Sequence, residues 1–212
     1  MGDDARRGGD RNHPARPRHA ASLVVLRRRG GRAELLMGRR APRNHFMPDV
    51  YVFPGGGVSP GDAGRPVASP LRPGVQRALR TAAQAPSPRA VASAAVRETH
   101  EETGLRLGSV VEGELRAELA KLHYLARAIT PSYHSTRYHA RFFLAERGDL
   151  RGAVRSNGEL LDLRWVSLEE ARSLPIVDVT ELVLDQVALF VAGARRSPPL
   201  IYYRNRKPIL RS

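Results

Sequence analysis

The spacing of apolar residues predicts strands in the first quarter of the chain. Residues 21–27 form a nearly continuous apolar run of strand length, and residues 33–38 form a second one. Two glycines within residues 29–32 place a turn between the runs, which predicts a hairpin. A shorter apolar run at residues 50–53 leads into three consecutive glycines. The pattern therefore predicts a sheet in which the third strand ends in a glycine-rich loop.

Small apolar residues at positions 90–96 indicate a helix, which Gly104 ends. Apolar runs return after it and predict strands at 109–114, 122–129, 138–145 and 161–166. The sequence Ser-Leu-Glu-Glu at 167–170 is a capping box that predicts the start of another helix. A last helix is predicted from Asp178 to Gly193, with an apolar face that packs in the core.

Shifts in composition divide the chain. Residues 1–19 are charged and poor in apolar side chains, so they are predicted to be a disordered basic arm. Residues 20–193 carry the periodic segments and are predicted to form one domain, followed by a C-terminal tail at 194–212. Glycine, proline, serine and arginine interrupt this domain at 63–89, which predicts a loop with a short helix at 75–83.

The composition narrows the class of protein. A chain of 212 residues is long enough for one domain with a stable core, and the absence of cysteine excludes disulfides and cysteine-based metal sites. The sequence has no run of 18 apolar residues and no apolar signal core. We therefore predict a cytoplasmic protein without a membrane partner, and the composition leaves a homodimer open.

The net charge of +14 raises the question of nucleic acid as a partner. Nearly all of the 35 basic residues are arginines, and they are spread from Arg6 to Arg211 without a stripe interleaved with aromatic residues. Such a spread favours a generally basic surface that attracts small polyanions over a dedicated nucleic-acid face. Nucleic acid is therefore disfavoured as a partner.

The segment from Arg97 to Leu105 concentrates candidate chemistry. On a helix, Glu98, Glu101 and Glu102 lie at spacings i, i+3 and i+4, so their carboxylates share one face. Such like charges repel unless a cation joins them, and carboxylate ligands without cysteine favour Mg²⁺ or Mn²⁺. An isolated glutamate pair is more often a solvated helix face. The glycine loop upstream shifts the balance here toward a site for phosphates.

This segment resembles the second half of the Nudix box, whose pattern is G-x5-E-x7-R-E-U-x-E-E-x-G-U. The residues that fit are Arg97, Glu98, Glu101, Glu102, Gly104 and Leu105. Thr99 stands where an aliphatic residue is usual. In the first half, Gly56 fits the opening glycine and Asp62 stands in the place of the glutamate. Because 34 residues lie between Asp62 and Arg97 instead of 7, the resemblance implies an insertion of 27 residues.

The resemblance implies a fold and a set of metal ligands. The fold would be α/β, a Nudix-type α/β/α sandwich with a mixed central sheet. Mg²⁺ would be held by the Gly55 carbonyl and by the carboxylates of Glu98, Glu101 and Glu102. Glu98 or Glu159 would act as general base, although Glu159 also fits an ordinary loop acid.

Further candidates come from the residues themselves. The guanidinium of Arg97 is suited to hold a neighbouring glutamate in position. Gly56 and Gly57 are candidate substrate contacts, because glycine exposes backbone groups that a side chain would cover. Arg141 is predicted to meet a phosphate, and the alternative is an exposed arginine at the rim of a strand. The insertion, which carries five arginines, is predicted to be a lid that faces the substrate.

The implied reaction is Mg²⁺-dependent hydrolysis of the phosphoanhydride in a nucleoside diphosphate linked to another moiety. A split box preceded by residues 47–56 is similar to the branch with the mammalian motif 19 coenzyme A diphosphatases. Coenzyme A and its thioesters therefore lead as substrates, followed by nucleotide sugars and dinucleotides such as NADH. A catalytically silent ligand sensor or a nucleic-acid-binding module is the alternative, against which the three clustered carboxylates speak.

Overall fold

The structure, a computed structural model, describes residues 15–43, 47–80, 85–194 and 196–211. Within these residues the main sheet runs in the order β10-β2-β1-β9-β8-β11-β12, with β3 beside β2 and β4 beside β1. Its strands are β1 (Arg18–Arg29), β2 (Arg32–Arg40), β3 (Tyr51–Val52), β4 (Gly55–Gly57), β8 (His123–Ile129), β9 (Tyr138–Glu146), β10 (Leu160–Ser167), β11 (Leu200–Arg204) and β12 (Lys207–Arg211).

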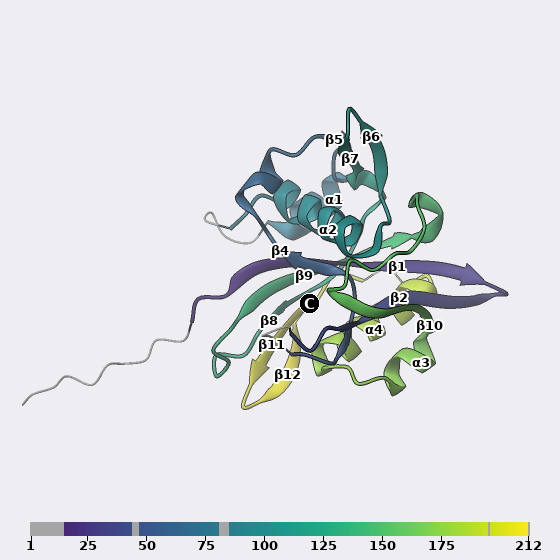
Figure 1. Cartoon of the computed structure of the whole chain (residues 1–212). Coiled ribbons are helices and arrows are strands. Elements are labelled where there is room, and N and C mark those ends of the chain that lie inside the picture. Colours follow the sequence, from purple (N-terminus) through teal and green to yellow (C-terminus); the bar gives the residue numbers. More distant parts are fainter. Residues whose placement is uncertain (1–14, 44–46, 81–84, 195, 212) are drawn as a thin grey trace, which may run out of the picture.

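Helices cover both faces of this sheet. In Figure 1, α2 (Pro88–Thr103) lies above the sheet, while α3 (Leu168–Ser173) and α4 (Asp178–Val191) lie below it. The sheet is mixed, since β1 is antiparallel to β2 and parallel to β9. The predicted α/β/α sandwich with a mixed central sheet is therefore confirmed. In the described part of the chain, none of the helices combines the length and apolar character that crossing a bilayer requires.

Strand β1 explains how the layers are held together. Leu23 and Val25 point to the α2 side and Val24 and Leu26 to the α4 side, and all four are fully buried. Successive side chains of a strand face opposite ways, and a strand covered on both faces needs apolar residues at every position. This is why the strand predicted at 21–27 reads as a continuous apolar run. We call the two resulting clusters the α2-side core and the α4-side core.

A second, smaller sheet lies beside α2. It has the order β5-β7-β6, with β5 (Val67–Ser69), β6 (Gly108–Val111) and β7 (Glu114–Glu118). The prediction of one strand at 109–114 was wrong, because the backbone turns between Val111 and Glu114. Glu112 and Gly113 there both have positive φ, 53° and 81°, as a two-residue hairpin turn requires.

The insertion is part of the folded domain. After a 3₁₀ turn at Pro60–Ala63 it contributes β5 and α1 (Pro73–Leu79), so the helix predicted at 75–83 begins and ends earlier, with residues 81–84 outside the described part. Leu71 and Leu79 are 7% and 4% exposed and belong to the α2-side core. Burial of these leucines anchors the insertion against the domain.

Replacing Leu79 by Ala is expected to lower the free energy of unfolding by about 2 to 3 kcal/mol, because it removes buried methyl groups and leaves a cavity. Urea unfolding measures this change. Leu210→Ala is the control, since Leu210 is 44% exposed and its loss should cost less than about 0.5 kcal/mol. Equal costs for both variants would contradict the anchoring role of Leu79.

Both predicted chain ends need correction. Arg18 and His19 belong to β1, so the ordered sheet begins inside the arm predicted at 1–19, of which residues 1–14 lie outside the described part. The C-terminal tail predicted at 194–212 contains the β11–β12 hairpin, in which Ile201 is fully buried. Asn205 and Arg206 form its turn with φ of 50° and 62°. The hairpin joins the main sheet because β11 runs parallel to β8.

Candidate functional site

Helix α2 is fixed at both ends. The Ser87 side-chain oxygen accepts a hydrogen bond from the Ala90 amide at 3.2 Å, which caps the first turn. Gly104 ends the helix in the left-handed conformation, with φ of 72°. Between them, small residues including Ala92 and Ala95 are fully buried and let the helix pack against β1. The acidic last turns of α2 are thereby held beside the glycines of β4.

Two glycines of β4 are required by this close approach. A Cβ atom on Gly56 would lie 2.5 and 2.6 Å from the two carboxylate oxygens of Glu98. A Cβ atom on Gly55 would lie 2.5 Å from the Ser22 side-chain oxygen. Because no side chain intervenes, the Gly55 amide donates a hydrogen bond to Glu102 Oε2 at 2.8 Å. The glycine loop and the acidic helix therefore form one unit.

Replacing Gly56 by Ala is expected to displace the Glu98 carboxylate and to lower kcat/KM at least about tenfold, because small misplacements of reacting groups are costly. Steady-state hydrolysis of any accepted substrate measures this. Gly61→Ala is the matched control, since a Cβ atom there meets nothing within 4 Å. If both variants kept the parent kcat/KM, the close packing of β4 on α2 would not matter for the reaction.

Arg97 connects both halves of the motif. Its Nε and Nη2 donate to the two Asp62 oxygens at 2.8 and 3.1 Å, and Nη2 also donates to the Gly57 carbonyl at 3.0 Å. Its Nη1 lies 2.7 Å from Glu98 Oε1 and 3.0 Å from Glu101 Oε2. The arginine predicted to position a glutamate thus contacts two of them and is held by Asp62 from across the insertion.

Asp62 is fully buried and nevertheless remains charged. Burial alone would raise the pKa of its carboxyl, but the hydrogen bonds and charge of Arg97, with the Ser59 amide at 2.7 Å, lower that pKa below its ordinary value. Asp62 stands where the motif has a glutamate, and it holds the Arg97 guanidinium in spite of the 34 intervening residues.

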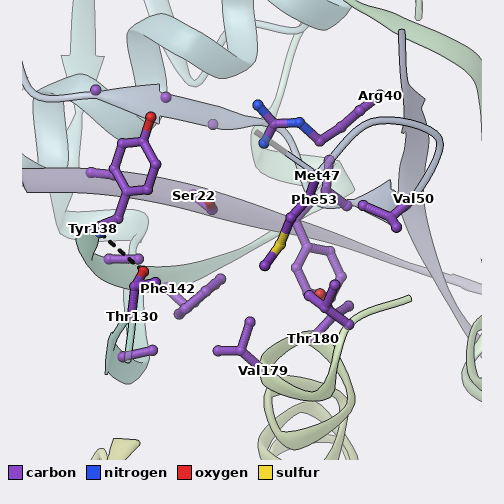
Figure 2. Close-up of a pocket in the computed structure, with 18 of the residues that line it drawn as sticks. Ser22, Arg40, Met47, Val50, Phe53, Thr130, Tyr138, Phe142, Val179 and Thr180 are labelled. Atoms are coloured by element: carbon purple, nitrogen blue, oxygen red, sulfur yellow. Dashed lines mark hydrogen bonds between the residues drawn. The ribbon is translucent and has the colours of Figure 1, made fainter. Parts of the chain in front are cut away.

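The carboxylates open onto a pocket of about 410 Å³ on the α4 side of the sheet. Glu98, Glu102 and Glu159 all line it, as do the three glycines of β4. Figure 2 shows Arg40 above the pocket, Tyr138 and Phe53 on opposite sides of it, and Val179 below. The charged wall, formed by Glu98, Glu102 and Glu159, therefore faces the same cavity as several apolar and aromatic side chains, as expected for a ligand that carries both kinds of group.

The pKa values of two glutamates in the charged wall are raised. Glu102 is 6% exposed, and burial, together with the charges of Glu98 and Glu159, raises its pKa to about 8 against the hydrogen bond from Gly55. Burial likewise raises the pKa of Glu98, although Arg97 opposes this shift. A bound cation would favour the ionised form of carboxylates that share a buried pocket. Their hard oxygen atoms suit Mg²⁺ or Mn²⁺.

The carboxylates do not form a complete set of metal ligands. Among the described residues no group of three His, Cys, Asp or Glu side chains is arranged to hold a metal ion. Glu101, a predicted ligand, is 49% exposed, pairs with Arg97 and does not line the pocket. The carboxyl oxygens of Glu98, Glu102 and Glu159 are nevertheless the kind of donor that a divalent cation takes, whereas the predicted ligand Glu101 lies outside the pocket lining.

Arg141, a predicted phosphate contact, lies away from the pocket. Arg141 is 1% exposed, and its Nη1 lies 2.7 Å from His19 Nδ1 and donates to the His139 carbonyl. It shares the α2-facing side of β9 with Phe143, whereas the pocket is lined by the alternate residues Ala140 and Phe142. Arg141 is therefore not placed to bind a substrate in this pocket.

The described part of the insertion does not cover this pocket. None of its described residues lines the cavity. The side chains of Arg65, Arg72 and Arg89 hydrogen-bond within the domain. Arg72 donates to the Leu122 carbonyl at 2.8 Å and Arg89 to the Arg65 carbonyl at 2.5 Å. The apolar leucines of the insertion direct it to the α2-side core, away from the cavity.

Several pocket residues were not predicted from the sequence as site residues. Ser22 and Arg40 lie on β1 and β2, and only the strand register brings them to the cavity. Tyr203 lies on β11, within the segment predicted to be a tail. The one available signal was the pair of apolar runs on either side of Asn205-Arg206, which is a hairpin pattern.

Comparisons with known proteins add to this picture. Residues 87–186 match the family model described as NUDIX domain. No curated protein matches the chain. The crystal structure of a NUDIX hydrolase from Alicyclobacillus acidocaldarius is similar at 26% sequence identity and a TM-score of 0.65, over 87% of this chain and 99% of that chain.

Two further structures share the fold at lower identity. A C. elegans Ap4A hydrolase, in a binary complex, has 19% identity and a TM-score of 0.52 over 83% of this chain and 98% of its own. The NUDIX domain of Shewanella oneidensis NrtR, complexed with ADP ribose, has 11% identity and a TM-score of 0.53 over 84% and 90%.

Proposed function

Since the chain carries a Nudix domain and is a pyrophosphohydrolase of the Nudix type, we propose that it hydrolyses the diphosphate of a nucleoside diphosphate linked to another moiety, with Mg²⁺ or Mn²⁺ as cofactor. One observation carries this proposal. Glu98, Glu102 and Glu159 line the same cavity as the glycine loop and several aromatic side chains. The cavity thus offers a place for a diphosphate and a separate place for a ring.

Each group of the charged wall has a role in this proposal. Glu98, Glu102 and Glu159 would hold the divalent cation, which when bound neutralises the diphosphate and lowers the pKa of a water molecule. Glu98 or Glu159 accepts the proton of the attacking water. Arg97 keeps Glu98 in place, since its guanidinium is itself fixed by Asp62. The open backbone of Gly55 to Gly57 lets the phosphates approach the carboxylates.

The candidates for the second moiety come from the resemblance and from one structural neighbour. Coenzyme A and its thioesters lead through the resemblance of residues 47–56 and the split box. ADP ribose is added because the NUDIX domain of NrtR was crystallised with it. A nucleotide sugar and NADH complete the set. A cytoplasmic location and a homodimer stay predictions.

A substrate panel tests the proposal. The purified full-length protein is incubated with coenzyme A, acetyl coenzyme A, ADP ribose, NADH and a nucleotide sugar, with and without Mg²⁺. We expect release of a nucleoside monophosphate from at least one compound only when the cation is present. Ligand binding without hydrolysis under any metal condition would instead support a silent sensor and overturn the proposed reaction.

A further inference from the structure

The aromatic wall of the pocket comes from three segments that meet below the main sheet. Tyr133 and His134 lie on the loop between β8 and β9, Asp178 begins α4, and Tyr203 lies on β11. We call these four residues the aromatic wall. In Figure 1 the β11–β12 hairpin and α4 lie on the side of the sheet away from α2. The hairpin also lies outside residues 87–186, which match the family model.

Tyr203 is held in place from α4. Its hydroxyl donates to Asp178 Oδ1 at 2.6 Å, and the same oxygen accepts the Val179 amide at 2.7 Å. Burial and this carboxylate raise the pKa of Tyr203, so the phenol keeps its proton and remains a donor. The ring is therefore fixed at the cavity by a bond to a second element.

Tyr133 is held from the hairpin and remains accessible. The Arg206 guanidinium, at the hairpin turn, lies 5.5 Å from the centroid of the Tyr133 ring. The His134 ring lies 4.7 Å from the same ring at a tilt of 35°. Tyr133 is nevertheless 55% exposed, so its ring is accessible to a ligand. The hairpin thus supplies one ring directly and positions another.

We propose that the aromatic wall binds the planar base of the substrate nucleoside, and that the base is of the adenine type. Aromatic rings stack on planar bases, which gives Tyr133, His134 and Tyr203 their role. A carboxylate has about four acceptor sites, and Asp178 uses two on Tyr203 and Val179. Its remaining capacity suits the exocyclic amine of adenine. The inference rests on the proposed function, which supplies the nucleoside.

Binding without turnover tests this assignment. Isothermal titration of the full chain without a divalent cation compares AMP, IMP and ribose 5-phosphate. The parent protein should bind AMP at least about tenfold more tightly than ribose 5-phosphate, because stacking on the base is lost in the latter. It should also prefer AMP to IMP, which lacks the amine. Asp178→Asn should reduce that second preference.

Variants assign the effect to the wall. Tyr203→Ala and, from a different element, Tyr133→Ala should each weaken AMP binding at least about fivefold and leave ribose 5-phosphate unchanged. Tyr203→Phe keeps the ring and should retain most of the AMP affinity. Tyr202→Ala is the matched control, because Tyr202 lies on the opposite face of the same strand and does not line the cavity. Thermal unfolding of each variant shows that it is folded.

The outcomes separate the base site from the reaction. Equal affinity of the parent for AMP and ribose 5-phosphate, or an unchanged ratio in both folded alanine variants, would overturn the assignment of the wall. Metal-dependent hydrolysis could still be present in that case, which leaves the proposed function standing. Conversely, preference for AMP that depends on Tyr203 without any hydrolysis of the panel supports the base site and overturns the reaction.

Discussion

Replacing Glu102 by Gln is expected to lower kcat by a factor on the order of 10² or more under saturating Mg²⁺, while the fold persists. Glu102 lines the pocket together with Glu98 and Glu159, and an amide cannot supply the negative charge that binds a cation. Stability should not fall, because burial already disfavours the charged form of this carboxyl and glutamine keeps an oxygen that can accept the Gly55 amide.

The measurement is steady-state hydrolysis of the best substrate over a range of Mg²⁺ concentrations, with thermal unfolding alongside. Glu169→Gln is the matched control, since Glu169 is an exposed helical glutamate in α3 and does not line the pocket. A Glu102 variant that hydrolyses at the parent rate would mean that this helix does not carry the metal site.

Replacing Asp62 by Asn is expected to lower the free energy of unfolding by about 3 to 5 kcal/mol and to reduce kcat/KM as well. Asp62 is fully buried and accepts hydrogen bonds from Arg97 and Ser59. The amide of asparagine turns one acceptor into a donor that faces the guanidinium, and removing one partner of a buried ion pair is costly. The loss of activity follows because Arg97 also holds Glu98.

This stabilisation has a defined dependence on pH. The pKa of Asp62 is lowered in the folded protein, so its contribution is fully present above the unfolded value of about 3.9 and is lost as the pH falls through the folded value. Urea unfolding from pH 7 downward should therefore show parent and variant converging only in acid.

Asp185→Asn supplies the comparison for this experiment. Asp185 pairs with Arg172 at 2.6 Å, but both side chains are more than a third exposed. Its loss should cost less than about 1 kcal/mol. A loss of the same size in the Asp62 variant would show that the buried pair with Arg97 stabilises the fold no more than an exposed ion pair does.

The elements predicted correctly are those in which local pattern and packing agree. Strand β1 reads as a strand because both of its faces are covered, and the end of α2 is predicted by Gly104. The pairing of Asp62 with Arg97 was not predicted, and 34 residues separate the two along the chain. Closing a longer loop costs only about 0.6 kcal/mol per doubling, so sequence separation is a weak argument against a contact.

The remaining differences depend on which segments, distant along the chain, pair with each other. Whether Arg141 faces the cavity depends on which side of β9 takes the odd positions, and the neighbouring strands set this parity. The β11–β12 hairpin was missed because its stability comes from pairing with β8, which lies about 70 residues earlier. Tyr203 could not be assigned to the site without that pairing.

The same hairpin covers the β8 edge of the main sheet. Strand β8 would otherwise present a row of unpaired backbone groups, and such an edge invites pairing with other chains. In the described part of the chain, β12 forms the outer edge instead. It is five residues long and carries Lys207, Pro208 and Arg211. Proline lacks an amide donor and the charges repel a second copy, so the sheet ends in a strand that is poorly suited to start a fibril.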